Sequence, residues 1–212
     1  MARWVMVIDL RKCIGCGACK KVCISTNKIH PTTRWRQVFE GPAKEGDGKR
    51  LFLTISCMHC NNPPCLDVCP SKATYRRSDG IVDIDYGRCV GCGYCIVACP
   101  YKVRSLATGD LISLDEGDST EKSDMRPDRI GVCMKCNFCL PRLDRGLAQG
   151  LKPGIDPEAT PACVNFCVSE ALHFGDLDDP ESVVSRMILE NKFVRLGEDL
   201  CTEPSVYYIC EG

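Results

Sequence analysis

The feature that most constrains this chain is a run of four cysteines near its middle. Cys89, Cys92 and Cys95 are each two residues apart, and Cys99 follows after three more and precedes a proline. The spacing C-x2-C-x2-C-x3-C-P is typical of [4Fe–4S] sites, in which the first three thiolates bind one cluster. The fourth thiolate binds the other cluster of a two-cluster unit. The run, here called motif 3, therefore predicts further cysteine motifs, and the sequence holds three.

Motif 1 repeats this pattern 76 residues earlier, at Cys13, Cys16, Cys19 and Cys23. Both copies follow a short apolar run that ends in aspartate, and both have glycines between the cysteines: Val5–Asp9 with Gly15 and Gly17, and Ile81–Asp85 with Gly91 and Gly93. Glycine accepts a positive φ at little cost, so the backbone can wind tightly around a cluster. The two stretches form an internal repeat.

Two further motifs have wider spacings. Motif 2 consists of Cys57, Cys60, Cys65 and Cys69. Motif 4 begins with three cysteines that compete for two places, Cys133, Cys136 and Cys139, and ends with Cys163 and Cys167. The residues after Cys167 resemble those after Cys69, Ser169–Leu172 against Ser71–Thr74. Motif 4 is therefore interpreted as a relative of motif 2 with an expanded middle loop.

If ligands cross between paired motifs, the chain contains two modules. Motifs 2 and 3 would bind one cluster through Cys57, Cys60, Cys65 and Cys99, and another through Cys89, Cys92, Cys95 and Cys69. Motifs 1 and 4 would bind one through Cys13, Cys16, Cys19 and Cys167, and another through Cys23, Cys163 and two of the three competing cysteines. Ligation within each motif is the alternative.

Other uses of cysteine fit the sequence less well. Cysteine provides 19 of 212 residues, which in a short secreted chain would indicate disulfides. Met1 leads directly into a strand-like run without a recognisable signal peptide, so we expect thiols that are kept for metal. Zinc is the main rival, but three cysteines at two-residue gaps with a fourth oversupply a tetrahedral site. Each motif offers a fourth cysteine, so an open catalytic iron is not indicated.

Charge and hydropathy further narrow the class of protein to which this chain can belong. The formal net charge is −1, which gives no support for binding nucleic acid. No uncharged apolar run approaches the roughly 20 residues that span a bilayer, so any membrane attachment is expected through a partner. Five cations flank the motifs and either raise the cluster potentials or are simply solvated: Arg11, Lys12, Lys20, Lys21 and Arg88.

We predict an α+β fold of two bacterial-ferredoxin-like two-cluster modules with loop insertions. Module A would comprise residues 1–30 plus 125–178, and module B residues 50–110. Residues 31–49 and 111–124 are expected as insertions or connectors, and 179–212 as a C-terminal helix and tail.

Local patterns predict several elements within these boundaries. Strands are expected at 5–8, 51–55 and 81–84, and a surface loop over 24–50 in which Trp35 and Phe39 form local core. Asp179 is expected to cap a helix that Asn191 closes. The tail around 204–209 would add a strand or lie along a partner.

Together the motifs resemble those of the iron–sulfur electron-transfer (beta) subunits of the dimethyl-sulfoxide-reductase superfamily of molybdopterin oxidoreductases. The resemblance covers nearly the whole chain. It rests on Val7–Asp9 before Cys13, Cys57-Met-His-Cys60 with Pro63-Pro-Cys65, Cys89–Cys95 with Cys99-Pro-Tyr101 and Arg104, Lys135-Cys-Asn-Phe-Cys139 with Arg142, Pro161-Ala-Cys163, and Ala171–Asp176. One departure is Val168, which stands where relatives often have proline.

The resemblance implies four [4Fe–4S] clusters and a non-catalytic role. It favours Cys136 and Cys139 as the ligands that join Cys163 and Cys23. Three cysteines then have no cluster to bind, and we expect them as buried free thiols: Cys133, Cys201 and Cys210. Some relatives lose the ligand at Cys92 and hold a [3Fe–4S] cluster; this chain keeps it.

The resemblance also implies partners: a catalytic subunit with a molybdenum or tungsten bis-pterin cofactor, and a quinone-reactive membrane subunit. Motifs 1 and 4 would lie nearer the first, and motifs 2 and 3 nearer the second. Alternatives are a free-standing polyferredoxin, or a subunit of a hydrogenase or formate dehydrogenase complex. The sequence leaves open the substrate, the direction of electron flow and the side of the membrane.

Overall fold

The computed structural model describes residues 2–30, 33, 35–43, 50–107 and 129–210. The predicted connector over 111–124 lies outside these ranges, and no helix within them is long and apolar enough to cross a membrane. In chain order the elements are β1 (Trp4–Asp9), α1 (Ala18–Asn27), β2 (Arg36–Ala43), β3 (Arg50–Ser56), α2 (Pro64–Asp67), β4 (Thr74–Arg76), β5 (Val82–Ile84), α3 (Tyr94–Ala98), β6 (Ser105–Leu106), β7 (Cys133–Met134), α4 (Leu140–Ala148), α5 (Ala162–Asn165), β8 (Leu172–Asp176), α6 (Val183–Glu190), β9 (Phe193–Val194), the 3-10 helix η3 (Glu198–Leu200) and β10 (Val206–Ile209).

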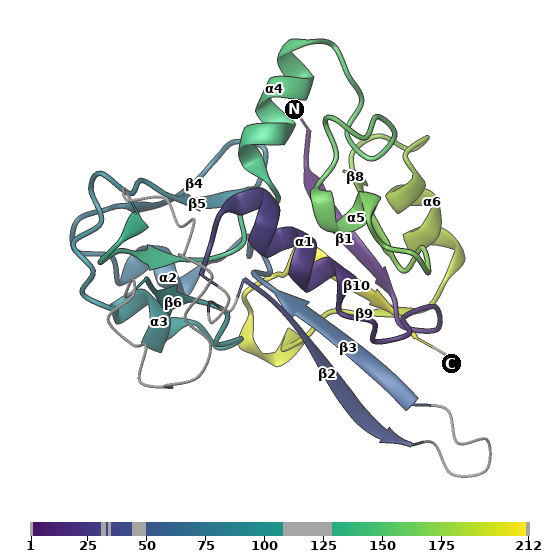
Figure 1. The fold of residues 1–212 in the computed structure, drawn as a ribbon, viewed down its shortest axis with the longest axis horizontal. Coiled ribbons are helices and arrows are strands. Elements are labelled where there is room, and N and C mark those ends of the chain that lie inside the picture. Colours follow the sequence, from purple (N-terminus) through teal and green to yellow (C-terminus); the bar gives the residue numbers. More distant parts are fainter. Residues whose placement is uncertain (1, 31–32, 34, 44–49, 108–128, 211–212) are drawn as a thin grey trace, which may run out of the picture.

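The largest sheet is built around the N-terminal strand and has the order β8-β1-β10-β9 (Figure 1). β1 pairs antiparallel with β8 and parallel with β10, so the predicted N-terminal strand is present and the tail adds a strand. All six β1 side chains are buried, because both faces of the sheet are covered. Val5 and Val7 pack with Val184 of α6, while the even-numbered side chains face the main core, which contains cysteines.

The internal repeat extends to the pairing of strands. β1 precedes motif 1 and pairs with β8, which follows motif 4; the N–H of Asp9 donates to the carbonyl of Ala171 at 2.8 Å. β5 precedes motif 3 and pairs with β4, which follows motif 2; the N–H of Asp85 donates to the carbonyl of Ala73 at 2.8 Å. The two ribbons are equivalent under the repeat. They bring motif 1 to motif 4 and motif 2 to motif 3.

A β-hairpin occupies much of the stretch predicted as a surface loop over 24–50. α1 continues to Asn27, and β2 pairs antiparallel with β3 from Arg36 opposite Ser56 onward. Trp35 is 1% exposed, as expected of local core, whereas Phe39 is 48% exposed. The loop prediction was wrong because the glycines and prolines after Phe39 hid the preceding strand pattern.

The C-terminal helix α6 begins later than predicted. Its N-cap is Ser182, whose Oγ accepts the N–H of Ser185 at 3.2 Å. Asp179 instead accepts the N–H of Glu181 at 2.9 Å, which is a local turn before the helix. Asn191 is the C-cap, as predicted.

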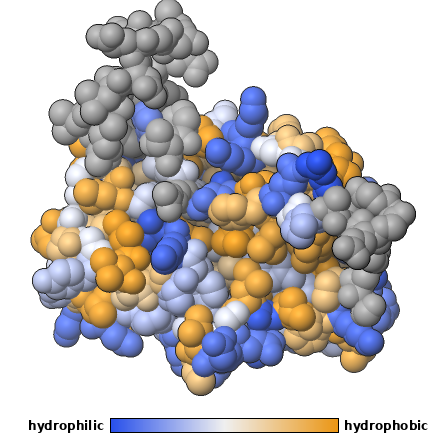
Figure 2. Space-filling view, turned by 90° about the horizontal axis from the view of Figure 1, so that it is seen from below, coloured by the Kyte–Doolittle hydropathy of each residue, from blue (hydrophilic) through white to orange (hydrophobic). Residues whose placement is uncertain are grey.

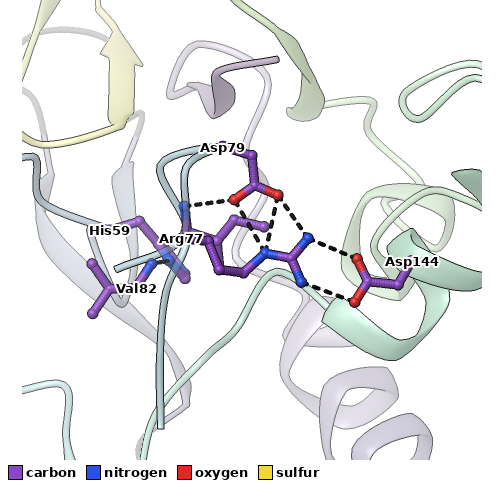
Figure 3. Close-up of polar contacts among 6 residues, drawn as sticks. His59, Arg77, Asp79, Val82 and Asp144 are labelled. Atoms are coloured by element: carbon purple, nitrogen blue, oxygen red, sulfur yellow. Dashed lines mark hydrogen bonds and ion pairs between the residues drawn. The ribbon is translucent and has the colours of Figure 1, made fainter. Parts of the chain in front are cut away.

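Arg77 links the two halves of the fold (Figure 3). It lies just after β4, and its Nη2 donates to Asp79 Oδ2 at 2.9 Å. The same guanidinium donates twice to Asp144 of α4, with both distances 2.9 Å. β4 follows motif 2 and α4 lies within motif 4, so this bidentate pair connects one motif pair with the other.

Replacing Arg77 by methionine is expected to lower the free energy of unfolding by about 1 kcal/mol. The effect is modest because the paired side chains are 29% and 46% exposed, so solvent screens their attraction. A double-mutant cycle with Asp144→Asn, followed by denaturant unfolding, isolates the pair. A coupling energy of zero would show that the contact does not join the two halves energetically.

Candidate metal centres

Three cavities are each lined by four cysteines from two motifs. Cradle 1 consists of Cys13, Cys16, Cys19 and Cys167. Cradle 2 consists of Cys23, Cys136, Cys139 and Cys163. Cradle 3 consists of Cys57, Cys60, Cys65 and Cys99. The space between the lining atoms, part of it open to solvent, is about 320, 280 and 320 Å³, respectively.

Cradle 4 is the set that the repeat makes equivalent to cradle 1: Cys89, Cys92, Cys95 and Cys69. Its local contacts follow those of cradle 1. The sulfur of Cys69 accepts the N–H of Thr74 at 3.4 Å, and the sulfur of Cys167 accepts the N–H of Ala171 at 3.2 Å. One further resemblance is that Cys16 and Cys92 are the exposed members of their cradles.

Glycines shape the loops that carry the exposed cysteines. Gly15, Gly17, Gly91 and Gly93 all have φ between 69° and 78°, as the repeat predicted. A Cβ on Gly91 would lie 2.2 Å from the carbonyl oxygen of Gly131, so a side chain there is excluded by contact as well as by φ. Gly17 and Gly93 are the N-caps of α1 and α3. The loop geometry is therefore the same in motifs 1 and 3.

In cradles 1 to 3, the four cysteines line a cavity. Among the described residues, no three cysteine, histidine or carboxylate side chains converge closely enough to hold a single metal ion. Burial raises the pKa of Cys136 and of Cys163 to about 11, and that of Cys60 to about 12. A buried cradle therefore disfavours bare thiolates and favours thiolates bound to positive charge.

Arg36, at the start of β2, lies buried between cradles 1 and 2. It lines the cavity of cradle 2, and its charge interacts with Cys163, Cys136, Cys19 and Cys23. Burial alone would lower its pKa, but the surrounding thiolates raise it. Within the described part of the chain, its Nε and Nη1 have no hydrogen-bond partner. A cavity with a buried cation and unpaired donors fits a negatively charged, thiolate-bound group.

Two more buried cations adjoin the other cradles. Arg104 Nη2 donates to the sulfur of Cys65 at 2.9 Å, and the charge of the guanidinium also acts on Cys95 of cradle 4. Lys135 Nζ donates to the carbonyls of Val82 and Cys136.

Sequence reasoning missed Arg36 because it lies in the stretch predicted as a loop. The aromatic and β-branched residues Trp35, Val38 and Phe39 are the signal that could have placed it in a strand.

An aromatic stack joins cradles 2 and 3. The rings of His59, from motif 2, and Phe138, from motif 4, are stacked with centroids 3.8 Å apart. Figure 3 shows His59 beside Val82, whose N–H donates to His59 Nδ1 at 3.1 Å. Burial, with Lys135 and Arg104 nearby, holds the pKa of His59 far below its usual value, so the ring is neutral.

The three remaining cysteines have different surroundings. Cys133 is buried on β7, and its N–H donates to the sulfur of Cys89 at 3.4 Å. Its side chain packs in one cluster with Cys95 and lowers the pKa of that residue. It therefore adjoins cradle 4, while Cys136 and Cys139 line cradle 2. Cys201 is exposed and Cys210 is half-buried, so the prediction of burial was wrong for these two.

Comparison with known proteins identifies the same signatures. Two families, both described as 4Fe-4S dicluster domain, match residues 12–73 and 49–111, respectively. The menaquinone reductase iron-sulfur cluster-binding subunit of Nitratidesulfovibrio vulgaris is 36% identical, over 98% of this chain and 88% of its own. The thiosulfate reductase electron transfer subunit of Salmonella typhi is 36% identical, over 97% and 91%. One component of the selenate reductase of Mesobacillus selenatarsenatis is 37% identical, over 98% and 72%.

These similarities extend along nearly the full chain. The matched stretches contain motifs 1, 2 and 3, and the relatives span motif 4 as well. The chain therefore belongs to the iron–sulfur electron-transfer (beta) subunits of the dimethyl-sulfoxide-reductase superfamily of molybdopterin oxidoreductases.

Proposed function

We propose that this chain binds one [4Fe–4S] cluster in each of cradles 1 to 4 and conducts electrons between a catalytic subunit and a membrane subunit. The observation that carries the proposal is that three cavities are each lined by four cysteines from two motifs. When bound, the clusters supply one-electron carriers. The chain's own residues hold them, exclude water from them and adjust their charge environment.

Burial of the cysteines supports a row with cradles 1 and 4 at its ends. All four cysteines of cradle 2 are buried, and so are all four of cradle 3. Cradles 1 and 4 each have an exposed cysteine, Cys16 and Cys92. Cradles 1 and 2 share α1, and the stack of His59 on Phe138 joins cradles 2 and 3. Electrons would therefore enter and leave at the two ends and cross between modules at this stack.

Exposed apolar side chains surround both ends of the row. Beside cradle 4 they are Val90, Tyr94 and Val97, and beside cradle 1 they are Ile14, Phe166 and Val168. Figure 2 shows, for one face, that apolar patches lie among charged residues over much of the surface. Large apolar side chains gathered at redox sites are typical of interfaces with partner proteins.

The partners follow from the family. We propose that a molybdenum or tungsten bis-pterin subunit contacts the cradle 1 end and that a quinone-reactive membrane subunit contacts the cradle 4 end. Membrane association would then come through that second partner. The chain's role in the complex is electron transfer without a catalytic site of its own, and the names of the relatives accord with this.

Purification of the full chain from its native source under anaerobic conditions tests the proposal. We expect it to elute with a large subunit that contains a pterin cofactor, with iron equivalent to four clusters in this chain and the EPR signals of reduced clusters. A nickel–iron partner would assign the chain to a hydrogenase complex. A monomer without a large partner would favour a polyferredoxin, and a zinc-loaded, EPR-silent chain would overturn cluster binding itself.

A further inference from the structure

Two buried arginines each adjoin a pair of cradles, although Arg36 comes from the stretch 31–49 that was predicted as an insertion outside both modules. Arg36 is 2% exposed and lies between cradles 1 and 2. Arg104 is 3% exposed and lies between cradles 3 and 4. The two residues come from unrelated positions of the sequence, one on β2 and one after motif 3. The repeat therefore does not account for this shared placement.

The chain fixes the position of Arg36 without neutralising it. Pairing of β2 with β3 sets Arg36 opposite Ser56, the residue before Cys57. Its Nη2 donates to Ser56 Oγ at 3.3 Å and contacts Met6 Sδ at 3.1 Å. These partners are uncharged, and the Nε and Nη1 donors lack a partner within the described chain. The side chain is thus anchored at one nitrogen and keeps two unpaired donors in the lining of cradle 2.

Arg104 contacts cradle 3 directly. Its Nη1 donates to Thr74 Oγ1 at 3.3 Å, and its Nη2 donates to the sulfur of Cys65, a member of cradle 3. The charge of the same guanidinium also acts on Cys95, a member of cradle 4 that packs in one cluster with Cys65. One cation therefore adjoins the ligands of two cradles. No carboxylate pairs with it in the described part of the chain.

Burial distinguishes these two arginines from most other cations near the motifs. Lys135 is also buried, but its ammonium donates to the backbone carbonyls of Val82 and Cys136. Lys20 and Lys21 on α1, like Arg11, Lys12 and Arg88, are exposed. Water and salt screen exposed charges, whereas a charge inside the protein acts at much lower effective dielectric constant. Guanidinium also stays protonated at any working pH, so its charge is permanent.

We infer that Arg36 and Arg104 are the residues that set the reduction potentials of modules A and B, each by stabilising the reduced state of both clusters beside it. The inference rests on the cluster binding proposed above. Reduction adds one electron to a group that is already negative, and no bond is made or broken. A permanent positive charge between two such groups favours that electron on either of them. The effect is expected on the two cradles that each arginine adjoins.

The test is a redox titration, followed by EPR, of the full chain and of Arg36→Gln and Arg104→Gln. The wild-type chain must first show four clusters, so failure of cluster binding is recognised separately. In Arg36→Gln, the module A clusters should be harder to reduce, with the reduced-to-oxidised ratio at fixed potential at least tenfold lower. A tenfold change corresponds to about 59 mV for one electron. Arg104→Gln should shift module B alone, so each variant is the control for the other.

Two further variants separate charge from structure. Lys20→Gln removes an equal charge from an exposed position next to Cys19, and it should leave all four potentials nearly unchanged. Arg36→Lys keeps the charge and should retain most of the wild-type potential. Unchanged potentials in both glutamine variants would overturn the inference. So would loss of the module A clusters in Arg36→Gln and Arg36→Lys alike, because it would show a structural role.

Discussion

Replacing Cys23 by alanine is expected to remove the cluster of cradle 2 and to leave that of cradle 1, although Cys23 belongs to motif 1. Cys23 lines the cavity formed with Cys136, Cys139 and Cys163, whereas Cys13 lines a different cavity with Cys167. Without Cys23, a [4Fe–4S] cluster in cradle 2 would keep only three of its four thiolates. The described residues that line cradle 2 include no further thiol that could replace it.

The physical basis is the helix that follows motif 1. Cys19 and Cys23 are both buried on α1, four residues apart, and yet they line different cavities. α1 packs against α5, which carries Cys163. Helix α1 therefore supplies Cys19 to cradle 1 and Cys23 to cradle 2, although both cysteines belong to motif 1.

The measurement compares EPR spectra and iron content across a set of single variants. Cys23→Ala and Cys163→Ala should lose the same reduced-cluster signal, and Cys13→Ala and Cys167→Ala should lose a different one. Cys210→Ala is the matched control and should keep the full iron content, because Cys210 lines none of the three cavities. Loss of one common signal in Cys13→Ala and Cys23→Ala would mean that ligation stays within the motif.

The sequence was informative where cysteine spacing, glycine and strand patterns act together. Motifs 1 and 3 differ by a constant shift, and the structure repeats their φ angles, helix starts and the bonds of Asp9 and Asp85. These features depend on local chain geometry, which short sequence patterns encode well. The parallel pairing of β10 with β1 depends on contacts between the two ends of the chain, which no local pattern specifies.

Arg36 shows why part of the site could not be predicted. A charged residue in a stretch with glycine and proline is predicted to lie at the surface, and burial of arginine is rare. Its burial follows from the β2–β3 pairing and from the cavity beside it, neither of which is visible in the sequence. Cys133 is a similar case: the spacing offered it as a ligand of motif 4, but β7 places it beside Cys89 and Cys95.

Removing the iron is expected to abolish cooperative unfolding of the chain. The main core contains six cradle cysteines beside ordinary apolar side chains: Cys19, Cys57, Cys60, Cys99, Cys136 and Cys163. α2, α3 and α5 are only four or five residues long, and three of the four described sheets have two strands. Helices and ribbons of this size are not stable by themselves in water.

The magnitudes indicate that the clusters decide whether the chain folds. A structural metal site of the zinc-finger kind contributes on the order of 10 kcal/mol of folding free energy. A whole domain is stable by only about 5–15 kcal/mol. If each of several thiolate-bound clusters contributes an amount of that order, their removal exceeds the net stability of the protein.

Thermal unfolding followed by circular dichroism, before and after chelation of the iron, measures the effect. The iron-free chain should lose its sharp transition, and reconstitution with iron and sulfide under reducing conditions should restore it. Residual structure is expected in the layer of β1, β10 and α6, where Val5, Val7, Val184 and Ile209 pack without a cysteine. An iron-free chain that melts at the temperature of the intact protein would show that apolar packing alone holds the cradles open.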